Sequence, residues 1–498
     1  MLFNSIKFLI FFPIVTIGYF LIPFRFRWLL LLIASCLFYM AFIPKYILFL
    51  FLLIGIDFTA GIMIEQSKEE HRKIYLIISI LSTCAALFVF KYFNFFNNTA
   101  AGLSHFLGWH FKPYHFGWVL PIGLSFHTFQ SLSYVIEVYK GRYKAERNLG
   151  IYALYVMFYP QLVAGPIERP YHLLPQFYKE HSVDYERITG GLKLMAWGFF
   201  KKAVIADRLA IFVNNAYADH NSLGITYLIA TIFFAFQIYC DFSGYTDIAI
   251  GAAKVMGFEL IKNFDRPYIA KSLTEFWHRW HISLSTWFRD YVYISLGGNR
   301  TTIPFWILSI MITFIISGLW HGANWTFVIW GALNGFYMVF GRLTSGIRDS
   351  LAQKTGLSRH PMLHNGLKIL TTFLLVCMGW VFFRAKDLGE AAHILKDIFY
   401  KGNGSIYGWL THITSADNYS IIQTDILNKI GPDQFQFGCG VLMVVVMLIF
   451  EAVLGEKLFS QLALGWKAPA RWLVYYGLVI AIIALGVFNR SPFIYFQF

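Results

Sequence analysis

The chain has 498 residues, and its composition excludes an ordinary soluble globular protein. Hydrophobic residues make up 57% of it and charged residues only 14%, whereas soluble domains carry about 25% charged residues. The mean hydropathy is +0.55. The formal net charge of +14 is spread over loops between apolar stretches, which is typical of a membrane protein under the positive-inside rule. We therefore expect no nucleic-acid partner.

Apolar stretches recur along the whole chain, and they predict an all-α, polytopic membrane protein. Several are shorter than the ~20 residues that a straight span needs. We therefore expect about 10–13 helices, some crossing the membrane and some re-entrant. In chain order the stretches are 7–23, 28–43, 46–65, 74–93, 117–138, 203–218, 224–252, 303–320, 324–341, 368–383, 440–455 and 472–488.

Basic residues fall in alternate loops of the first five stretches, at Arg25/Arg27, Lys68–Lys73 and Lys140–Arg147. Because cytoplasmic loops carry the excess of Lys and Arg, these loops are predicted to be cytoplasmic and the N-terminus extracytoplasmic. The first stretch lacks a small-residue cleavage site and is interpreted as a retained anchor. Five scattered cysteines without CxxC spacing argue against a disulfide framework or a zinc cluster.

No internal repeat or low-complexity linker interrupts the chain, so a single membrane domain is predicted over 1–498. Within it we distinguish N-terminal helices (1–138), a catalytic core (139–345) and C-terminal helices (346–498). Four prolines between 160 and 175 rule out a straight helix there. That segment is either a re-entrant element lining a cavity or a plain cytoplasmic loop. A further helix is expected at Leu388–Tyr400, in a polar excursion.

The polar region 254–302 contains Glu275-Phe276-Trp277-His278-Arg279-Trp280-His281. Its aromatic and basic residues suggest an interfacial amphipathic helix. In a helix, His278 and His281 would share one face. A metal would need at least one more donor, so no metal site is predicted, and for His278 an ordinary interfacial histidine is favoured over a metal ligand.

His321 lies between two apolar runs, in Ser317-Gly318-Leu319-Trp320-His321-Gly322. Ionisable side chains at membrane depth are functional candidates, although a helix-end histidine satisfied by a carbonyl is the simpler alternative. If His281 and His321 face one cavity, the pair suits acyl transfer. One imidazole would act as general base, and the other would hydrogen-bond the oxyanion or orient the first.

Two carboxylates, Asp241 and Asp247, interrupt an apolar region at Gln237–Asp247. They are interpreted either as a polar wall of the same cavity or as hydrogen-bond acceptors that stabilise helices. No GxSxG elbow or reactive-cysteine setting is present, which favours direct transfer over a covalent enzyme intermediate.

Six stretches, in order, resemble the membrane-bound O-acyltransferase (MBOAT) family, specifically its bacterial alginate O-acetylase branch. The likeness covers nearly the whole chain. The stretches are Leu162–Arg169, Tyr239–Tyr245, Trp280–Ser285, Gly318–Gly322, Trp380–Ala385 and Phe493–Phe498.

The resemblance implies a multi-helix fold around a central cavity, with His321 at the family's essential histidine and His281 at its second signature position. It implies that an acetyl group leaves a cytoplasmic donor, expected to be acetyl-CoA, and crosses the bacterial inner membrane. An extracytoplasmic partner protein would then acetylate a polysaccharide such as alginate. No tightly bound cofactor is expected. D-alanyl transfer for teichoic acids, a polysaccharide transporter and a silent envelope scaffold remain the alternatives.

Further side chains are expected to contact substrate in that cavity. They are Trp320, Asp241, Ser243, Tyr245, Arg279 and Asn324. Arg279, Lys201 and Lys202 could hold the phosphates of the donor, although basic residues at a cytoplasmic interface are expected in any case.

Overall fold

The structure is a computed structural model, and the part of the chain that it describes is helical without strands. It describes residues 1–118, 120–121, 123–162, 165–400, 404–406, 408, 416–431, 434–454, 466–488 and 493–494. Two compact units are present. The N-terminal unit contains Met1–Met195 and Tyr245–Lys262, and the C-terminal unit contains Ala196–Gly244 and Asn263–Phe498.

The all-α membrane architecture predicted from composition is confirmed. Seven helices among the described residues are long and apolar enough to cross a membrane, and a shorter apolar helix covers Ile6–Leu21. Four predicted stretches, 28–43, 117–138, 203–218 and 324–341, are not among these seven. The predicted threefold division of one domain remains a prediction.

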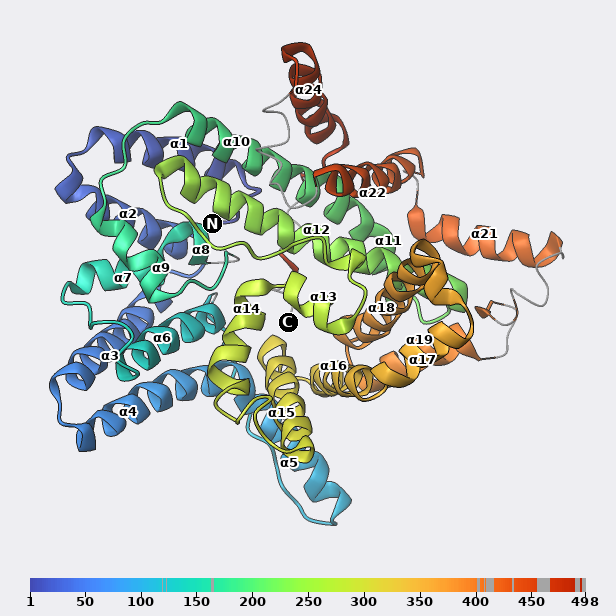
Figure 1. Ribbon diagram of the computed structural model, residues 1–498, viewed down its shortest axis with the longest axis horizontal. Coiled ribbons are helices and arrows are strands. Elements are labelled where there is room, and N and C mark those ends of the chain that lie inside the picture. Colours follow the sequence, from blue (N-terminus) through green and yellow to red (C-terminus); the bar gives the residue numbers. More distant parts are fainter. Residues whose placement is uncertain are drawn as a thin grey trace. The chain divides into compact units, whose positions relative to one another are not determined.

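The N-terminal unit consists of a helical bundle and the short helices α8 and α9 (Figure 1). Its elements are α1 (Ile6–Leu21), α2 (Phe24–Met40), α3 (Tyr46–Gln66), α4 (Glu69–Leu87), η1 (Phe88–Tyr92), α5 (Phe93–Phe106), α6 (Leu124–Tyr139), α7 (Leu149–Met157), α8 (Tyr159–Leu162), α9 (Pro170–Leu173), η2 (Leu174–Tyr178) and most of α10 (Tyr185–Phe199).

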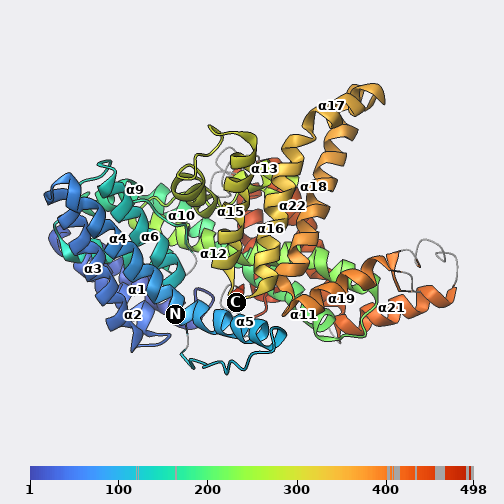
Figure 2. The same cartoon turned by 90° about the horizontal axis from the view of Figure 1, so that it is seen from below.

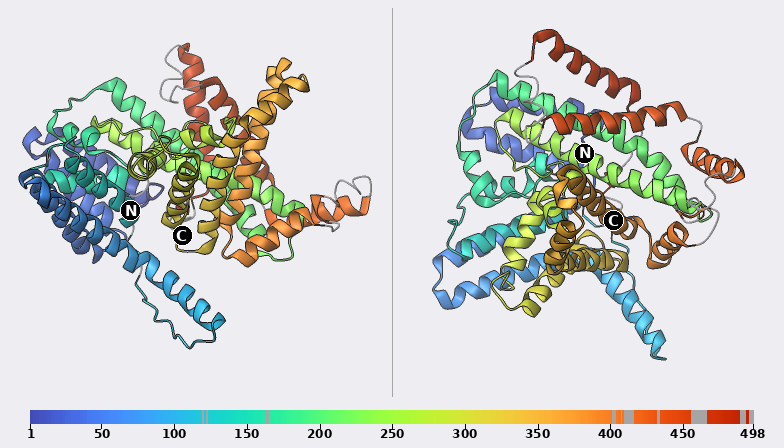
Figure 3. Two further views of the ribbon diagram at one scale, coloured as in Figure 1. Left: turned by 60° about the horizontal axis from the view of Figure 1, so that its bottom comes forward. Right: turned by 45° about the vertical axis from the view of Figure 1, so that its right-hand side comes forward.

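Local sequence explains where these helices begin. Ser5 and Asn148 accept hydrogen bonds from the first free N–H groups of α1 and α7, as N-caps do. Pro23 immediately precedes α2. The helices α3, α4 and α6 pack side by side, whereas α5 projects away from them (Figure 3).

A buried carboxylate fixes α3 against α4. Asp57 is fully buried and accepts hydrogen bonds from Ser79 Oγ (2.6 Å) and Thr83 Oγ1 (3.4 Å). A buried polar group costs stability unless it is hydrogen-bonded. These two α4 hydroxyls therefore explain how the bundle accommodates an aspartate inside an apolar helix.

The proline-rich segment forms short helices rather than one straight helix, as predicted. Its residues from Tyr159 to Leu162 are buried, and Glu168 is fully buried. Glu168 binds His172 Nδ1 (2.7 Å) and the backbone N–H of Ile261 (2.7 Å). The segment is thus part of the packed interior of its unit and not a plain surface loop. Val163 and Ala164, from the first family-like stretch, lie outside the described residues.

The C-terminal unit contains the end of α10 and most of α12 (Gly224–Met256). Its other elements are η3 (Phe200–Ala206), α11 (Asp207–Ala218), η4 (Pro267–Ile269), α13 (Leu273–Arg279), α14 (Ile282–Phe288), η5 (Arg289–Tyr293), α15 (Ile303–His321), α16 (Trp325–Leu343), α17 (Ser345–Lys354), η6 (Leu357–Arg359), α18 (Pro361–Arg384), α19 (Leu388–Phe399), α21 (Ala416–Ile430), α22 (Gln434–Leu454) and α24 (Ala468–Leu485). The helix predicted at Leu388–Tyr400 is confirmed as α19.

Glycines allow α15 and α16 to pack at very short range. A Cβ on Gly318 would lie 2.2 Å from the carbonyl oxygen of Phe327, and one on Gly331 would lie 2.3 Å from that of Phe314. Small residues let helix backbones approach closely in membrane proteins. This hairpin carries Trp320 and His321 at the end of its first helix.

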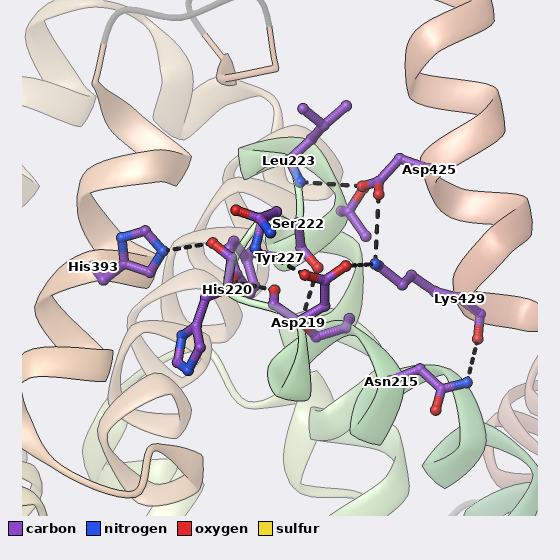
Figure 4. A network of polar contacts seen from close by, with 12 residues as sticks. Asn215, Asp219, His220, Ser222, Leu223, Tyr227, His393, Asp425 and Lys429 are labelled. Atoms are coloured by element: carbon purple, nitrogen blue, oxygen red, sulfur yellow. Dashed lines mark hydrogen bonds and ion pairs between the residues drawn. The ribbon is translucent and has the colours of Figure 1, made fainter.

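The helices α17 and α19 lie at opposite ends of α18 (Figure 2). Between α11 and α12, Asp219 pairs with Lys429 of α21, and Asp425 accepts from Thr226 Oγ1 (2.6 Å) and the backbone N–H of Leu223 (3.1 Å) (Figure 4). His393 of α19 reaches the carbonyl oxygen of His220 (3.0 Å). These contacts join α19 and α21 to the α11–α12 turn.

Candidate active site

His321 is the last residue of α15 and is enclosed by aromatic rings. Its side chain is buried, and its ring centroid lies 4.9 Å from Trp320, 5.0 Å from Trp330 and 5.3 Å from Phe383. Asn324 caps the following helix and sets the short connection between α15 and α16. His321 is thus a helix-end residue buried among aromatic rings, and its role in the chemistry remains a prediction.

His281 lies at a break between two short helices. The single amphipathic helix predicted through this region is wrong, because α13 ends at Arg279 and α14 begins at Ile282. His281 has φ 44° and ψ 56°, a left-handed conformation that is uncommon outside glycine. The shared face predicted for His278 and His281 is wrong for the same reason: His278 is exposed, whereas His281 is 1% exposed.

The break places the His281 ring in an apolar environment. Phe242 lies 4.6 Å from it, edge to face, and Phe264 lies 6.4 Å from it. Burial lowers the pKa of His281 to about 3, because the charged imidazolium cannot be solvated there. His281 therefore remains a neutral imidazole at physiological pH.

Trp320 links the two histidines. Its ring centroid lies 6.4 Å from His281 and 4.9 Å from His321. The two imidazoles that the sequence singles out are thus brought to one buried indole, His281 from the start of α14 and His321 from the end of α15. A neutral imidazole can accept a proton in a general-base step, so this arrangement has the groups that acyl transfer requires.

Asp241 belongs to a buried ionic cluster next to the histidines. Lys202 Nζ lies 2.5 Å from Asp241 and 2.8 Å from Asp207, and all three side chains are buried. The second Asp241 oxygen accepts the backbone N–H of Ile494 (2.7 Å). Asp241 therefore anchors the C-terminal segment, where Phe493 packs 5.5 Å from Phe242. Residues 495–498 of the aromatic C-terminus lie outside the described residues.

The two lysines predicted as phosphate-binding or interfacial residues are buried in the C-terminal unit, and their contacts with donor phosphates remain predictions. Lys201 is buried and donates to Ser243 Oγ (2.9 Å), and Lys202 is held between two carboxylates. Neither occupies the exposed interface that the alternative interpretation required. Ser243 and Asp241 thus contact two adjacent buried lysines, Lys201 and Lys202.

Three other predicted substrate-binding residues have structural partners. Tyr245 belongs to the N-terminal unit and donates to Asn4 Oδ1 (3.1 Å). Arg279 pairs with Glu275 (2.9 Å) and Asp265 (3.7 Å). Asn324 caps α16 and donates to the carbonyl oxygen of Lys386 (2.7 Å). The predicted contacts of these three with substrate remain predictions.

Sequence reasoning missed Asn263 and Trp330. Asn263 is fully buried, and its side-chain oxygen lies 3.0 Å from His281 Nδ1. A single asparagine in Lys262-Asn263-Phe264 has no distinctive spacing, so nothing in the pattern indicated it. Trp330 lies nine residues after His321, and the contact between the two rings arises only because α16 packs back against α15.

Comparisons with known proteins are consistent with this geometry. Residues 147–383 match the model of the MBOAT, membrane-bound O-acyltransferase family, and both histidines lie inside the match. The "probable alginate O-acetylase AlgI" of Pseudomonas aeruginosa is 37% identical over 94% of this chain and 84% of its own. The chain belongs to the membrane-bound O-acyltransferase family. It is accordingly an O-acyltransferase of the membrane.

Two further relatives show the range of acceptors within the family. The peptidoglycan O-acetyltransferase of Helicobacter pylori is 31% identical over 100% of this chain and 98% of its own. The teichoic acid D-alanyltransferase of Streptococcus thermophilus is 28% identical over 53% of this chain and 68% of its own. The D-alanyl branch is thus the more distant of the two.

Proposed function

We propose that this O-acyltransferase takes an acetyl group from a cytoplasmic donor, acetyl-CoA, and passes it across the bacterial inner membrane for O-acetylation of an exported polysaccharide. The observation that carries the proposal is that the buried imidazoles of His281 and His321 both contact the indole of Trp320. Similarity to alginate and peptidoglycan O-acetylases over nearly the whole chain supports acetyl as the group transferred.

In the proposed step, His321 acts as general base. The acceptor hydroxyl oxygen attacks the thioester carbonyl while its proton passes to the imidazole. The carbon–sulfur bond then breaks, and the proton leaves His321 for the departing thiolate, so the products are an O-acetyl ester and free thiol. His281 takes the second role, either as a donor to the oxyanion or as a group that orients His321.

Moving only the acetyl group explains why a membrane protein is needed. Acetyl-CoA carries phosphates, and a charged group is costly to place in the bilayer core. An extracytoplasmic partner protein would receive the acetyl group and complete transfer to the polysaccharide, for which alginate is the first candidate.

Donor preference tests this proposal. Inverted membrane vesicles from cells that express the full-length protein, which retain envelope glycan and partner proteins, are supplied with acetyl-CoA labelled in the acetyl group or with an activated D-alanyl donor. Ester-linked label is then measured on the glycan. We expect label from acetyl-CoA alone. Label from the D-alanyl donor alone would overturn the acetyl proposal. Glycan uptake with no ester formed would instead favour a transporter.

A further inference from the structure

The side chain of Asn263 makes an unusually convergent set of contacts at the candidate active site. Its Oδ1 lies 2.9 Å from Ser283 Oγ, 3.0 Å from His281 Nδ1 and 3.2 Å from the backbone nitrogen of Ser283. Its own carbonyl oxygen accepts the backbone N–H of Ile282 (2.8 Å). Asn263 therefore holds both the side chain of His281 and the backbone that follows it.

The orientation of the Asn263 amide follows from one donor that cannot change its role. The backbone N–H of Ser283 can only donate, so the amide atom facing it must be the oxygen. A side-chain oxygen of asparagine can only accept. The neighbouring Nδ1 of His281 must therefore carry a proton and donate it to Oδ1.

This contact determines the tautomer of His281. A neutral imidazole has one N–H and one lone pair, and burial keeps this ring neutral. With the proton on Nδ1, the lone pair lies on Nε2. A lone pair accepts hydrogen bonds and cannot donate one to an oxyanion.

We propose that Asn263 is a positioning residue that locks His281 in its Nδ1-protonated tautomer, so that His281 serves acyl transfer as a hydrogen-bond acceptor through Nε2. The role of His281 in acyl transfer rests on the proposed function, whereas its tautomer does not. It leaves His281 the orienting role and removes the oxyanion-donor role. A similar logic operates where a fixed partner sets the tautomer of a catalytic histidine.

The strained backbone of His281 supports a positioning role. A left-handed conformation persists at a residue other than glycine only where its surroundings determine it. Here Asn263 bonds to residues 281, 282 and 283 in turn.

The groups around His281 decide how a new charge at position 263 would affect its protonation. The rings that face it are Phe242, Phe264 and Trp320, which do not titrate. The titratable groups next to those rings in sequence include Asp241, paired with Lys202; Asp265, near Arg279; and His321. The two aspartates are thus already engaged, and a new carboxylate at position 263 would act directly on His281.

The tautomer is measured first, without reference to activity. Full-length protein labelled with ¹⁵N-histidine is placed in lipid nanodiscs, and the His281 signals are assigned by their loss in His281→Gln. We expect an Nδ1-protonated neutral ring from about pH 5 to about pH 8. An Nε2-protonated or charged ring in that range would overturn the proposal, whether or not the protein transfers acetyl groups.

Variants at Asn263 then separate positioning from simple packing. Asn263→Leu removes the acceptor, and we expect a mixed tautomer and a roughly 10–100-fold loss of transfer. Asn263→Asp keeps an acceptor oxygen but adds a charge that raises the His281 pKa, so transfer should begin to fall at a higher pH than it does in the wild type. Asn215→Ala, which removes an amide contact to the Lys429 carbonyl (Figure 4), is the control.

The outcomes remain distinguishable if a variant folds poorly. An Asn263→Asp protein with the pH profile of the wild type, or an Asn263→Leu protein with the tautomer and transfer rate of the wild type, would contradict the proposal. Absence of transfer in the wild type would count against the proposed function alone, because the ¹⁵N signals still report the tautomer.

Discussion

At the residue scale, ionisable side chains are buried where a partner of opposite charge or a hydrogen bond compensates them. Lys202 is 1% exposed and lies between Asp207 and Asp241. Removing one partner of a buried ionic set leaves the others uncompensated. The cluster also connects to the C-terminal segment through the backbone N–H of Ile494, so its loss should affect both folding and the site beside Phe242.

We predict that Lys202→Met destabilises the protein by about 3–5 kcal/mol, because two carboxylates would remain buried without a cation. Thermal unfolding in detergent, followed by intrinsic fluorescence, checks this. The control is Lys354→Met at an exposed position of α17, for which no measurable change is expected. Equal unfolding temperatures for both variants would contradict the prediction.

A second residue-scale prediction concerns pH. The hydrogen bond from His172 to buried Glu168 raises the pKa of His172 above its usual value near 6.5. A raised folded-state pKa contributes stability that is present below the unfolded pKa and is lost as pH rises through the folded one. The contribution should therefore disappear on the alkaline side of about pH 6.5.

Unfolding temperatures of the wild type and His172→Gln, compared between about pH 5.5 and about pH 8.5, test this sign. The wild type should lose more stability toward alkaline pH than the variant does. The exposed His105→Gln protein serves as control and should follow the wild type. A wild type that gains stability relative to His172→Gln as pH rises would refute the assignment.

At the element scale, the α15–α16 hairpin positions His321 through contact between backbones. We predict that Gly318→Ala reduces acyl transfer by roughly 100-fold, because a misplacement of about 1 Å at an active site can cost that much. Its Cβ would lie 2.2 Å from the Phe327 carbonyl oxygen, so the helices must separate. Transfer rates per folded protein check the effect.

The matched control is Gly341→Ala in α16, where a Cβ would meet no atom within 4 Å. It should retain wild-type activity and gain slightly in helix propensity. Equal activity in the two alanine variants would show that the hairpin tolerates separation. His321 would then owe its position to other contacts.

The long apolar helices and the candidate catalytic residues could be predicted from the sequence, but the break between α13 and α14 could not. Apolar length predicts α3, α12, α15 and α18, because membrane spans need long hydrophobic stretches. The break at His281 escaped prediction because Trp277–Trp280 has a good amphipathic pattern. The left-handed turn depends on Asn263, 18 residues earlier in sequence.

The ion-pair partners of the basic side chains near the site also could not be predicted from the sequence. Arg279 and Lys202 are both basic residues in a less apolar region, yet one pairs near the surface and the other is buried between two carboxylates. Tyr245 follows Asp241 and Ser243 in one motif but belongs to the N-terminal unit. A shared motif therefore did not imply a shared set of contacts.

At the scale of the whole molecule, the charge distribution predicts membrane topology. The loop that contains α17 carries Arg348, Lys354 and Arg359 and should be cytoplasmic, whereas the segment around Gly117 has little charge and should be extracytoplasmic. A membrane-impermeant maleimide should label Gly117→Cys in intact cells. It should label Ser345→Cys only after permeabilisation.

Wild-type protein with its five native cysteines gives the background for this labelling. Each new cysteine is at an exposed position, so failure to react should reflect the side of the membrane and not burial. The reverse labelling pattern would place the N-terminus in the cytoplasm and invert the proposed direction of transfer.

The most direct test of the central claim compares acetyl transfer by wild type, His321→Ala and His278→Ala in liposomes with acetyl-labelled acetyl-CoA. Loss of a general base costs roughly 100- to 10,000-fold, so His321→Ala should lose transfer while remaining folded and inserted. The exposed His278→Ala protein should match the wild type. Undiminished transfer by His321→Ala would contradict the assignment of His321 as the base.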